Sequence, residues 1–557
     1  MIEVSTNDYA SNFREGKPLR ILILGTSNSL LRKGWVAGLR DAFPEAQIDN
    51  LSVGASPGIQ FALSIGLDFT SYDVVFLDSV PNDEEYQQVP HFSGTLGYSS
   101  EAFVDRIMFE IASTIAAETC LVVVGFCRKN NLESPSSVYR SRILIAQAAG
   151  AQFLDLRQLL LQFGPRVIGK GKDLYEEHPA HPQSPISYFF GSLIGEALIA
   201  AARGKGGFSL GKNNAARSYR HNFHAWVADD HVDASKLRLY QNSLLRENYY
   251  LIRENEAHDI SLPGICIGFN INAPATSCVV GLHSNDRKSI DISCFYDCRD
   301  GGFMKIFVPI PHGMALDRLT VTAASAKPAM RGLLSKPTPQ PNTPTALALS
   351  RLAFWTGTVD VDWKQSARSG GEALALTTAL YDRMQNEPGL FPVRSLVGTL
   401  RQSGVSKGVP SRALAFFSYH GTVIVYDITM DCCRHVAAPE LATNTSLFPV
   451  RARIDGATAI FFVVVGGFEL TVFIRLVDKR LGCEIEHASP QLDNRFCIVN
   501  MNTGVFALQC NHFYLAAEPS GKLVCNRREA REWETFTIGA LPDGGLYRSA
   551  EIQTVAA

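Results

Sequence analysis

The stretch that decides the fold of the first third of this chain reads Ile21-Leu22-Ile23-Leu24-Gly25-Thr26-Ser27-Asn28-Ser29. Its four apolar residues predict a buried strand, Gly25 turns the chain, and a helix is expected from Ser29 onward. In an open α/β sheet, sites form beyond the carboxyl ends of the strands. Ser27 would lie there with an exposed hydroxyl, a free N–H and a helix N-terminus behind it, which favour a developing negative charge. A plain helix N-cap is the alternative for a single serine.

Residues 19 to 203 alternate short apolar runs with helical patterns. This alternation predicts a parallel sheet covered by helices on both faces. The expected strands are Leu19–Leu24, Ala46–Leu51, Val74–Leu77, Cys120–Phe126 and Gln152–Leu156. The expected helices are Leu30–Ala42, Glu101–Ala117, Ser136–Ala149 and Pro185–Ala202.

Composition places the chain among ordinary globular proteins. A chain of 557 residues is too long to fold around a single hydrophobic core, so roughly three to four domains are expected. A net charge of −2 gives no strong field for nucleic acid or membrane surfaces, and we expect neither partner. No apolar signal region opens the sequence and no uninterrupted apolar run reaches spanning length, so we expect a cytoplasmic protein without a membrane span. The 12 cysteines form no CxxC pair, which predicts free, mostly buried thiols and no metal site.

Four loops of the first part carry residues suited to acyl-ester chemistry. In chain order they hold Ser27, Gly54, Asn82 and His181. A serine can attack an ester carbonyl while a histidine takes its proton. The N–H groups of Ser27 and Gly54 and the Asn82 amide would stabilise the oxyanion. Ser29 and Ser56 are rival nucleophiles, and ordinary turn residues are the alternative for each loop taken alone.

These four residues resemble the pattern of the SGNH (GDSL-type) hydrolases. The resemblance covers about a third of the chain and includes the Val80-Pro81-Asn82-Asp83 block and a histidine followed by proline and a last helix. It implies a flavodoxin-like α/β fold, with Ser27 as nucleophile, Gly54 and Asn82 as oxyanion donors, and His181 as general base. No metal or nucleotide cofactor is implied.

The chain departs from that family at the acid. The family's acid lies three residues before the histidine, and that position is His178 here. Glu177, Glu176 or Asp173 would have to replace it, or a backbone carbonyl would serve as in a Ser–His dyad. Alternatively, His178 is the base and Glu176 or Glu177 orients it.

The sequence changes character after residue 204. Short β-rich runs predict an antiparallel β-sandwich-like domain over residues 217–365. Such folds often bind carbohydrate. Core packing is the simpler interpretation of the aromatic residues in this region, and a sugar-binding platform is the alternative: Trp226, Tyr249, Tyr250 and Trp355. A Pro-rich segment spans Ser335–Thr345, and residues 366–410 form a connector.

Residues 411–541 contain three weak repeats with a period of forty-odd residues, each a strand, a tight turn and a second strand, which predicts a β-trefoil. The third repeat is similar to the fascin-like β-trefoil in Phe513–Glu518, Gly521–Arg527 and Trp533–Phe536. We expect Trp533 and Phe536 in its core, and a docking or carbohydrate-binding role rather than actin binding.

Together these features predict a multidomain protein with an α/β domain at 1–204. Our hypothesis is a serine esterase or O-acyltransferase that acts on an O-acyl group, foremost acetyl, of a carbohydrate or polysaccharide, with a protein partner conceivable at the β-domains. The rival is a non-catalytic glycan-binding or scaffold protein whose SGNH-like domain has lost its acid at His178.

Overall fold

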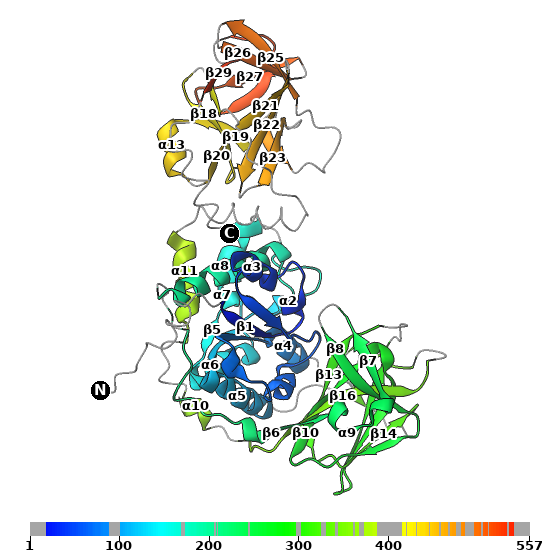
Figure 1. Cartoon of the computed structure of the whole chain (residues 1–557). Helices are drawn as coiled ribbons and strands as arrows, with labels where there is room; N and C mark the ends of the chain where they lie inside the picture. The colour runs from blue at the N-terminus through cyan, green and yellow to red at the C-terminus, as the bar shows by residue number, and fades with distance from the viewer. Residues whose placement is uncertain are drawn as a thin grey trace, which may run out of the picture. The chain divides into compact units, whose positions relative to one another are not determined.

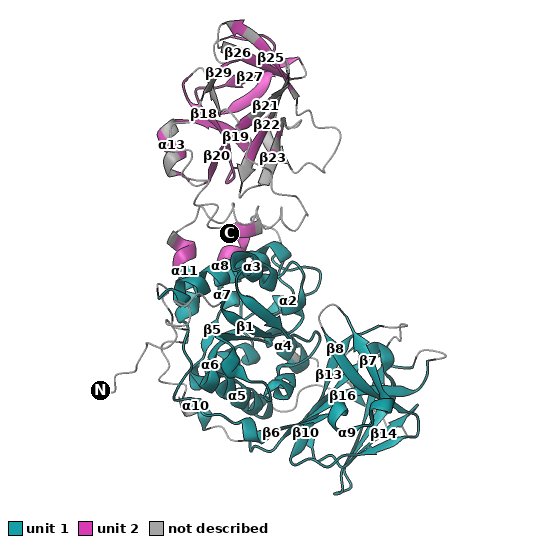
Figure 2. Ribbon diagram, viewed as in Figure 1, with its two compact units in different colours: residues 1–162, 173–381 teal, residues 163–172, 382–557 magenta. Residues whose placement is uncertain are grey.

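The computed structural model divides into two compact units, residues 1–162 with 173–381, and residues 163–172 with 382–557 (Figure 2). The residues that it describes are 18–88, 101–168, 173–204, 208, 210–242, 245–296, 302–324, 330–332, 334–339, 343–359, 362–366, 373–386, 415–418, 420–430, 432–444, 446–455, 458–465, 468–474, 481–484, 495–502, 505–510, 512–531 and 534–539. The connector at 366–410 and Trp533 therefore lie largely or wholly outside the described residues.

A parallel five-stranded sheet forms the centre of the first part of unit 1 (Figure 1). Its order is β2-β1-β3-β4-β5, so all five predicted strands are confirmed, with ends within two residues. The strands are β1 (Arg20–Leu24), β2 (Gln47–Asn50), β3 (Val74–Asp78), β4 (Cys120–Val124) and β5 (Gln152–Leu154). The order of connections reverses between β1 and β3. Sheets of this kind open a crevice at the carboxyl ends of the strands where that reversal occurs.

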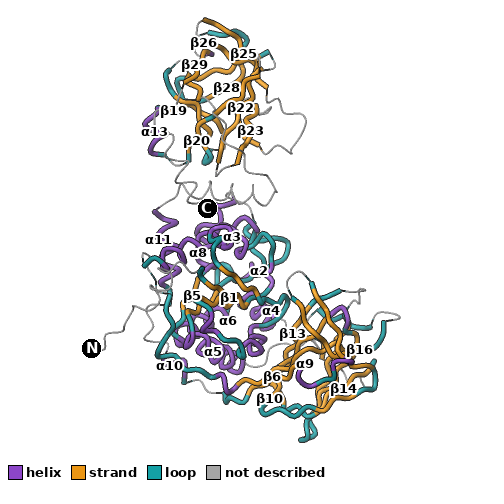
Figure 3. Tube along the Cα trace, viewed as in Figure 1, coloured by secondary structure: helices purple, strands orange, loops and turns teal. Residues whose placement is uncertain are grey.

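Helices cover both faces of this sheet (Figure 3). Alternate residues such as Leu22, Val75 and Leu121 share a core with α5 (Glu101–Glu118) and α6 (Ser137–Ala149). On the other face, the ring of Phe76 meets Trp35 of α3 (Trp35–Ala42) edge to face at 5.3 Å. Two helices were not predicted, namely α4 (Val80–Gln88) and α7 (Leu156–Ile168). The loop expected at Asn82–Asp83 is therefore wrong, because both residues lie in the first turn of α4.

The last helix of this part, α8 (Ser184–Ala202), is pressed against α3. A Cβ atom on Gly191 would lie 1.8 Å from the carbonyl oxygen of Trp35, so only glycine permits this contact between the two backbones. By length and composition, α8 is also the one helix among the described residues that would suffice to cross a membrane, and 56% of that window is buried in the protein. Polar residues such as Ser187 and Glu196 interrupt α8, so it is not the uninterrupted apolar run that the sequence was expected to lack.

The second part of unit 1 is an 11-stranded, mainly antiparallel sheet, here the middle sheet. The short β-rich runs of the sequence form seven of its strands: β6 (Phe223–Val227), β7 (Leu237–Gln241), β10 (Ile265–Asn272), β11 (Ser277–His283), β12 (Ser289–Phe295), β13 (Lys305–Met314) and β14 (Arg318–Thr322). Four were not predicted: β8 (Arg246–Arg253), β9 (Ala257–Asp259), β15 (Met330–Arg331) and β16 (Ala346–Trp355). Of these, β16 is central, because it pairs with β6, β8, β10 and β11.

The α/β part and the middle sheet share one hydrophobic core. Phe307 and Trp355 of the middle sheet belong to the same cluster as Ile59 and Met108. The Nε1–H of Trp355 donates to a carboxylate oxygen of Glu110 in α5 at 2.7 Å. The interpretation of core packing is confirmed and the alternative of a sugar platform is wrong, because all four aromatic residues are at most 9% exposed: Trp226, Tyr249, Tyr250 and Trp355.

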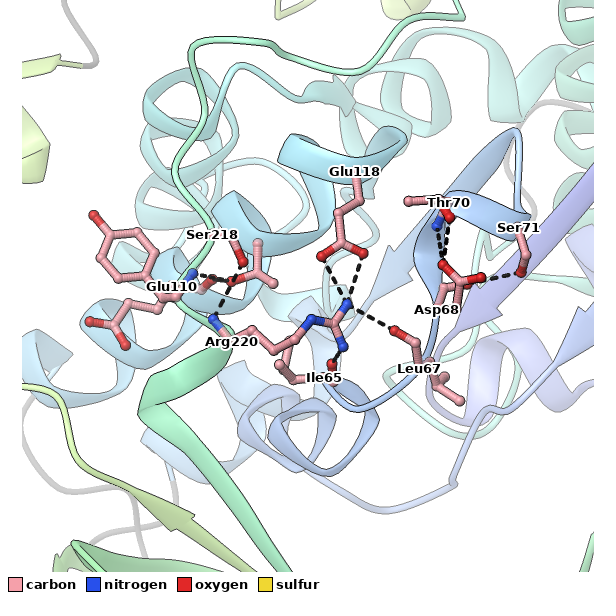
Figure 4. Close-up of polar contacts among 11 residues, drawn as sticks. Ile65, Leu67, Asp68, Thr70, Ser71, Glu110, Glu118, Ser218 and Arg220 are labelled. Carbon is pink, nitrogen blue, oxygen red and sulfur yellow. Dashed lines mark hydrogen bonds and ion pairs between the residues drawn. The ribbon is translucent and has the colours of Figure 1, made fainter.

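The segment between α8 and β6 is fastened to the α/β part by Arg220 (Figure 4). Its guanidinium donates to the backbone oxygens of Ile65 and Leu67. One of its nitrogens also lies 2.8 Å from each carboxylate oxygen of Glu118 at the end of α5. The chain thus enters the middle sheet from a fixed point on the α/β part.

Unit 2 contains a 13-stranded antiparallel sheet. Six of its strands pair in a closed ring, in the order β17 (Ala415–Ser418), β21 (Arg451–Asp455), β22 (Thr458–Val465), β25 (Arg495–Asn502), β26 (Val505–Cys510) and β29 (Thr535–Gly539). Three hairpins leave this ring: β18 (Val423–Asp427) with β19 (Cys432–Val436), β23 (Phe468–Ile474) with β24 (Leu481–Glu484), and β27 (Phe513–Ala517) with β28 (Leu523–Arg527). Phe536 is buried in the core as predicted.

Candidate functional site

Ser27 occupies the predicted position just beyond the end of β1. It is the first residue of α2 (Ser27–Leu30), and Thr26, not Ser27, precedes the helix as its N-cap. The N-cap interpretation of Ser27 is therefore wrong. The helix has only four residues, so the helix N-terminus expected behind the serine is a single turn with little dipole. Half-buried Ser27 keeps its hydroxyl available, whereas the rivals Ser29 and Ser56 are at most 2% exposed.

His181 is presented to Ser27 by a short hairpin-like loop. The N–H of Gln183 donates to Leu174 O, and the N–H of Glu176 donates to His181 O, both at 2.9 Å. The Nε2 atom of His181 lies 2.9 Å from Oγ of Ser27. The amide of Asn28, next to the serine, donates to Ala180 O at 3.0 Å and so joins the two loops. The structure therefore brings together the serine and the histidine that the loop order predicted to meet.

The surroundings of His181 keep its ring neutral. Burial lowers its pKa, the neighbouring His178, whose ring stacks on it at 4.4 Å, lowers the pKa as well, and the charge of Glu176 opposes both effects. Together they bring the pKa of His181 to about 4. A neutral imidazole whose Nε2 carries no proton accepts the hydrogen bond of the Ser27 hydroxyl. The histidine is thus in the form that a general base requires at neutral pH.

No carboxylate reaches Nδ1 of His181 among the described residues. Glu176 accepts the N–H of Ser184 at 2.9 Å, and Asp173 pairs with Lys129, which holds the pKa of that carboxyl below its usual range. Glu177 is exposed and makes no hydrogen bond in the described part of the chain. His178 is also exposed, and its Nδ1 accepts the N–H of Ala180 at 3.3 Å rather than a proton from Ser27. The arrangement is a Ser–His dyad.

Three N–H donors lie at the ends of neighbouring strands. Ser27 begins α2, where N–H groups have no intrahelical acceptor. The N–H of Gly54 has no acceptor among the described residues, and a Cβ on Gly54 would meet only Leu30 at 3.7 Å, so the space beside it is open. The Asn82 amide donates to Ser56 O at 3.0 Å, and its second hydrogen has no acceptor in the described part. These groups are the donors that an oxyanion would need.

Buried acids that sequence reasoning missed support these loops. Asp78, at the end of β3, accepts the hydroxyl of Ser29 at 2.7 Å, and burial raises the pKa of this carboxyl to about 6. Asp83 accepts the N–H of Gly58 at 2.7 Å and the hydroxyl of Ser79 at 2.8 Å. It also lies 2.9 Å from the guanidinium of Arg142. Their position beside the predicted loops is the only signal that the sequence offered for them.

Among the described residues, no group of three or more His, Cys, Asp or Glu side chains is placed to hold a metal ion. Burial raises the pKa of the Cys120 and Cys127 thiols to about 12, so both stay protonated in the core, as predicted.

The pH dependence of turnover should report the environment of His181. Because its neutral form is the base and its pKa is about 4, kcat/KM should rise through about pH 4 and stay level from about pH 5.5 to 8. Initial rates on an uncharged aryl acetate, with folding checked by circular dichroism at each pH, measure this. An inflection near the ordinary histidine value of about 6.5 would contradict the buried, neutral base.

Comparison with known proteins gives only distant likenesses. No family model and no curated protein matches the chain. Among solved structures, an α/β hydrolase enzyme from the metagenome of Lake Arreo, Spain, is 15% identical with a TM-score of 0.26, over 34% of this chain and 95% of that one. A putative GDSL-like lipase from Parabacteroides merdae is 11% identical with a TM-score of 0.23, over 34% and 97%. A designed three-fold symmetric protein, ThreeFoil, is 8% identical with a TM-score of 0.19, over 23% and 98%. Likenesses this slight carry no argument about function.

Proposed function

We propose that this chain is a serine hydrolase or acyltransferase that cleaves an O-acyl ester, foremost an acetyl ester of a carbohydrate, through Ser27 and His181. The observation that carries the proposal is the 2.9 Å contact between Ser27 Oγ and His181 Nε2 at the carboxyl edge of the sheet. The unengaged N–H groups around the same edge add support, since an oxyanion requires such donors.

The proposed reaction has two steps. Ser27 Oγ attacks the ester carbonyl carbon, its proton passes to His181 Nε2, and the carbonyl oxygen becomes an oxyanion facing the N–H groups of Ser27 and Gly54 and the Asn82 amide. The C–O bond to the alcohol then breaks, and the alcohol leaves with the proton from His181. Water, or a sugar hydroxyl, next gives its proton to His181 and attacks the carbonyl carbon of the acyl-serine. The bond from that carbon to Ser27 Oγ breaks, His181 returns the proton to Oγ, and the acid or the new ester leaves.

A non-catalytic scaffold is the second candidate, and a specific observation favours it. Without a carboxylate at Nδ1, no hydrogen bond among the described residues fixes the tautomer of His181, and the charge of Glu176 offsets only part of the burial that disfavours the imidazolium of the transition state. In a triad, loss of that acid costs about 10⁴-fold in kcat. A slow enzyme or an inactive relative would both fit this feature.

The β-rich parts supply the remaining elements of the proposal. The closed ring of six strands with three hairpins supports a β-trefoil in unit 2, and the middle sheet takes the place of the predicted sandwich. We assign the carbohydrate specificity or a protein partner to unit 2 by analogy of fold. A cytoplasmic polysaccharide precursor would be a fitting substrate.

Covalent trapping tests the proposal on the full-length chain. A fluorophosphonate, which reacts with activated serines, should add one phosphonyl group to the peptide that contains Ser27. The same protein should release acetate from an aryl acetate and, faster, from acetylated sugars. A folded chain with neither adduct nor turnover would overturn the enzyme in favour of the scaffold. An adduct on another serine would overturn the assignment of Ser27.

A further inference from the structure

Ser56 connects the two outer oxyanion donors to each other. Its carbonyl oxygen accepts the Asn82 amide at 3.0 Å, and its hydroxyl donates to Gly54 O at 3.1 Å. The side chain is fully buried. One residue therefore holds both the strand-end glycine and the asparagine that the proposed function requires.

The third bond of Ser56 comes from the middle sheet. The N–H of Phe307 in β13 donates to Ser56 Oγ at 2.9 Å, across 251 residues of sequence. In the order of the middle sheet, β13 ends the path, so one side of its backbone faces no neighbouring strand among the described residues. A buried backbone N–H needs an acceptor, and the serine hydroxyl provides one while using its own hydrogen on Gly54.

The loop that holds Ser56 needs such restraint. Ala55, between Gly54 and Ser56, has a φ of 51°, a left-handed conformation that alanine seldom adopts. The loop leads into η1 (Gly58–Ser64), which contacts β6, β10, β13 and β16 of the middle sheet. The loop is therefore held between the α/β part and the middle sheet, and its conformation depends on both.

We propose that Ser56 is a positioning residue for the oxyanion donors and that β13 is thereby part of the catalytic apparatus. This inference rests on the proposed function. According to this inference, the middle sheet does more than bind substrate, because it holds the loop that positions the N–H of Gly54. Ser56 passes the same restraint on to the side chain of Asn82. Displacing preorganised donors by even 1 Å costs catalysis more than substrate binding.

The test is Ser56→Ala in the full-length chain, assayed on an aryl acetate. We expect kcat to fall by about 10- to 100-fold while KM stays within about threefold, because the donors act on the transition state. Affinity for an aryl trifluoromethyl ketone, which forms an oxyanion on the serine, should fall in parallel with kcat/KM. The matched control is Ser52→Ala, since Ser52 is almost as buried on the same loop but its side chain bonds only Asn50 within the described part of the chain. It should change kcat less than about twofold.

A double-mutant cycle with Asn82→Ala distinguishes positioning of Asn82 from a general loss of structure. If Ser56 acts through Asn82, Ser56→Ala should cost much less when Asn82 is already alanine. Additive losses, or equal losses in Ser56→Ala and Ser52→Ala, would overturn the inference and leave the proposed function standing. A folded wild-type chain without turnover or adduct would overturn both. If thermal melting shows that Ser56→Ala is unfolded, Ser56→Thr replaces it, because threonine keeps the hydroxyl. Ser56→Thr should retain the wild-type kcat. A folded Ser56→Thr variant with a lowered kcat would count against the inference.

Discussion

Alanine in place of Ser27 is expected to lower turnover of an aryl acetate by roughly 10²- to 10⁴-fold. The substitution removes the nucleophile while leaving the N–H donors, so only binding and oxyanion stabilisation remain. The lower end of this range applies if the wild-type kcat is already low, since no acid contacts His181 Nδ1 among the described residues. Initial rates at pH 7.5, where His181 is neutral, measure the loss.

Ser64→Ala is the matched control for this measurement. Ser64 is half-buried like Ser27 but ends η1 and makes no side-chain hydrogen bond in the described part of the chain. Its turnover should equal that of the wild type. If Ser27→Ala retains wild-type turnover with an unchanged melting temperature, the hydrolysis comes from another group and the dyad is not the site.

The α/β part was predictable because its signals are local. Strands β1, β3 and β4 are short apolar runs that are buried on both faces almost throughout, whereas β2 is polar and partly exposed. The polar residues that follow β1, β2 and β3 meet at one edge of the sheet. That is why Ser27 and His181, 154 residues apart, were expected together and lie together. The failure at α4 was also local. Pro81 and the acidic residues after it are signals of a helix start, but Asn82 and Asp83 were assigned to a loop.

The middle sheet was less predictable because its central strand lacks an alternating pattern. Nine of the ten residues of β16 are buried, so apolar residues and Ser350 follow one another without the period of two that marks a half-exposed strand. Its start directly after the Pro-rich segment concealed it further. The strand β8 begins with Arg246 and Glu247, whose charges lowered its resemblance to a core strand.

The support of the candidate site could not be predicted at all. Ser56 depends on a backbone N–H of Phe307, and Asp83 depends on a guanidinium 59 residues away. Neither bond leaves a periodic or motif-like trace in the sequence. Such contacts are decided by how separate elements pack, and packing is what a single sequence encodes least visibly.

Methionine in place of Arg142 is expected to destabilise the α/β part by about 3–5 kcal/mol. The guanidinium, 2% exposed, lies 2.9 Å from Asp83 and 3.0 Å from Asp105, whose side chains are 0% and 7% exposed. Methionine fills similar volume but leaves two buried carboxylates without their cation. Native-state hydrogen exchange of peptides from α4 and α6 measures the loss without requiring the whole chain to unfold in one step. Arg140→Met, on the exposed face of α6, is the control and should stay within about 0.5 kcal/mol.

The same substitution separates the effect of charge from the effect of lost packing. Asp83 follows Asn82 directly and accepts the N–H of Gly58. An unpaired charge on Asp83 therefore disturbs both Asn82 and the loop from Gly54 to Gly58, here called the oxyanion loop. Adding Asp83→Asn to Arg142→Met should recover part of the protection and of the turnover, because it removes the buried charge that the arginine had balanced. If the double variant is less stable than Arg142→Met alone, the cost lies in lost contacts rather than in charge. If Arg142→Met exchanges like Arg140→Met, the carboxylates do not need the arginine and the oxyanion loop is held by Ser56 without it.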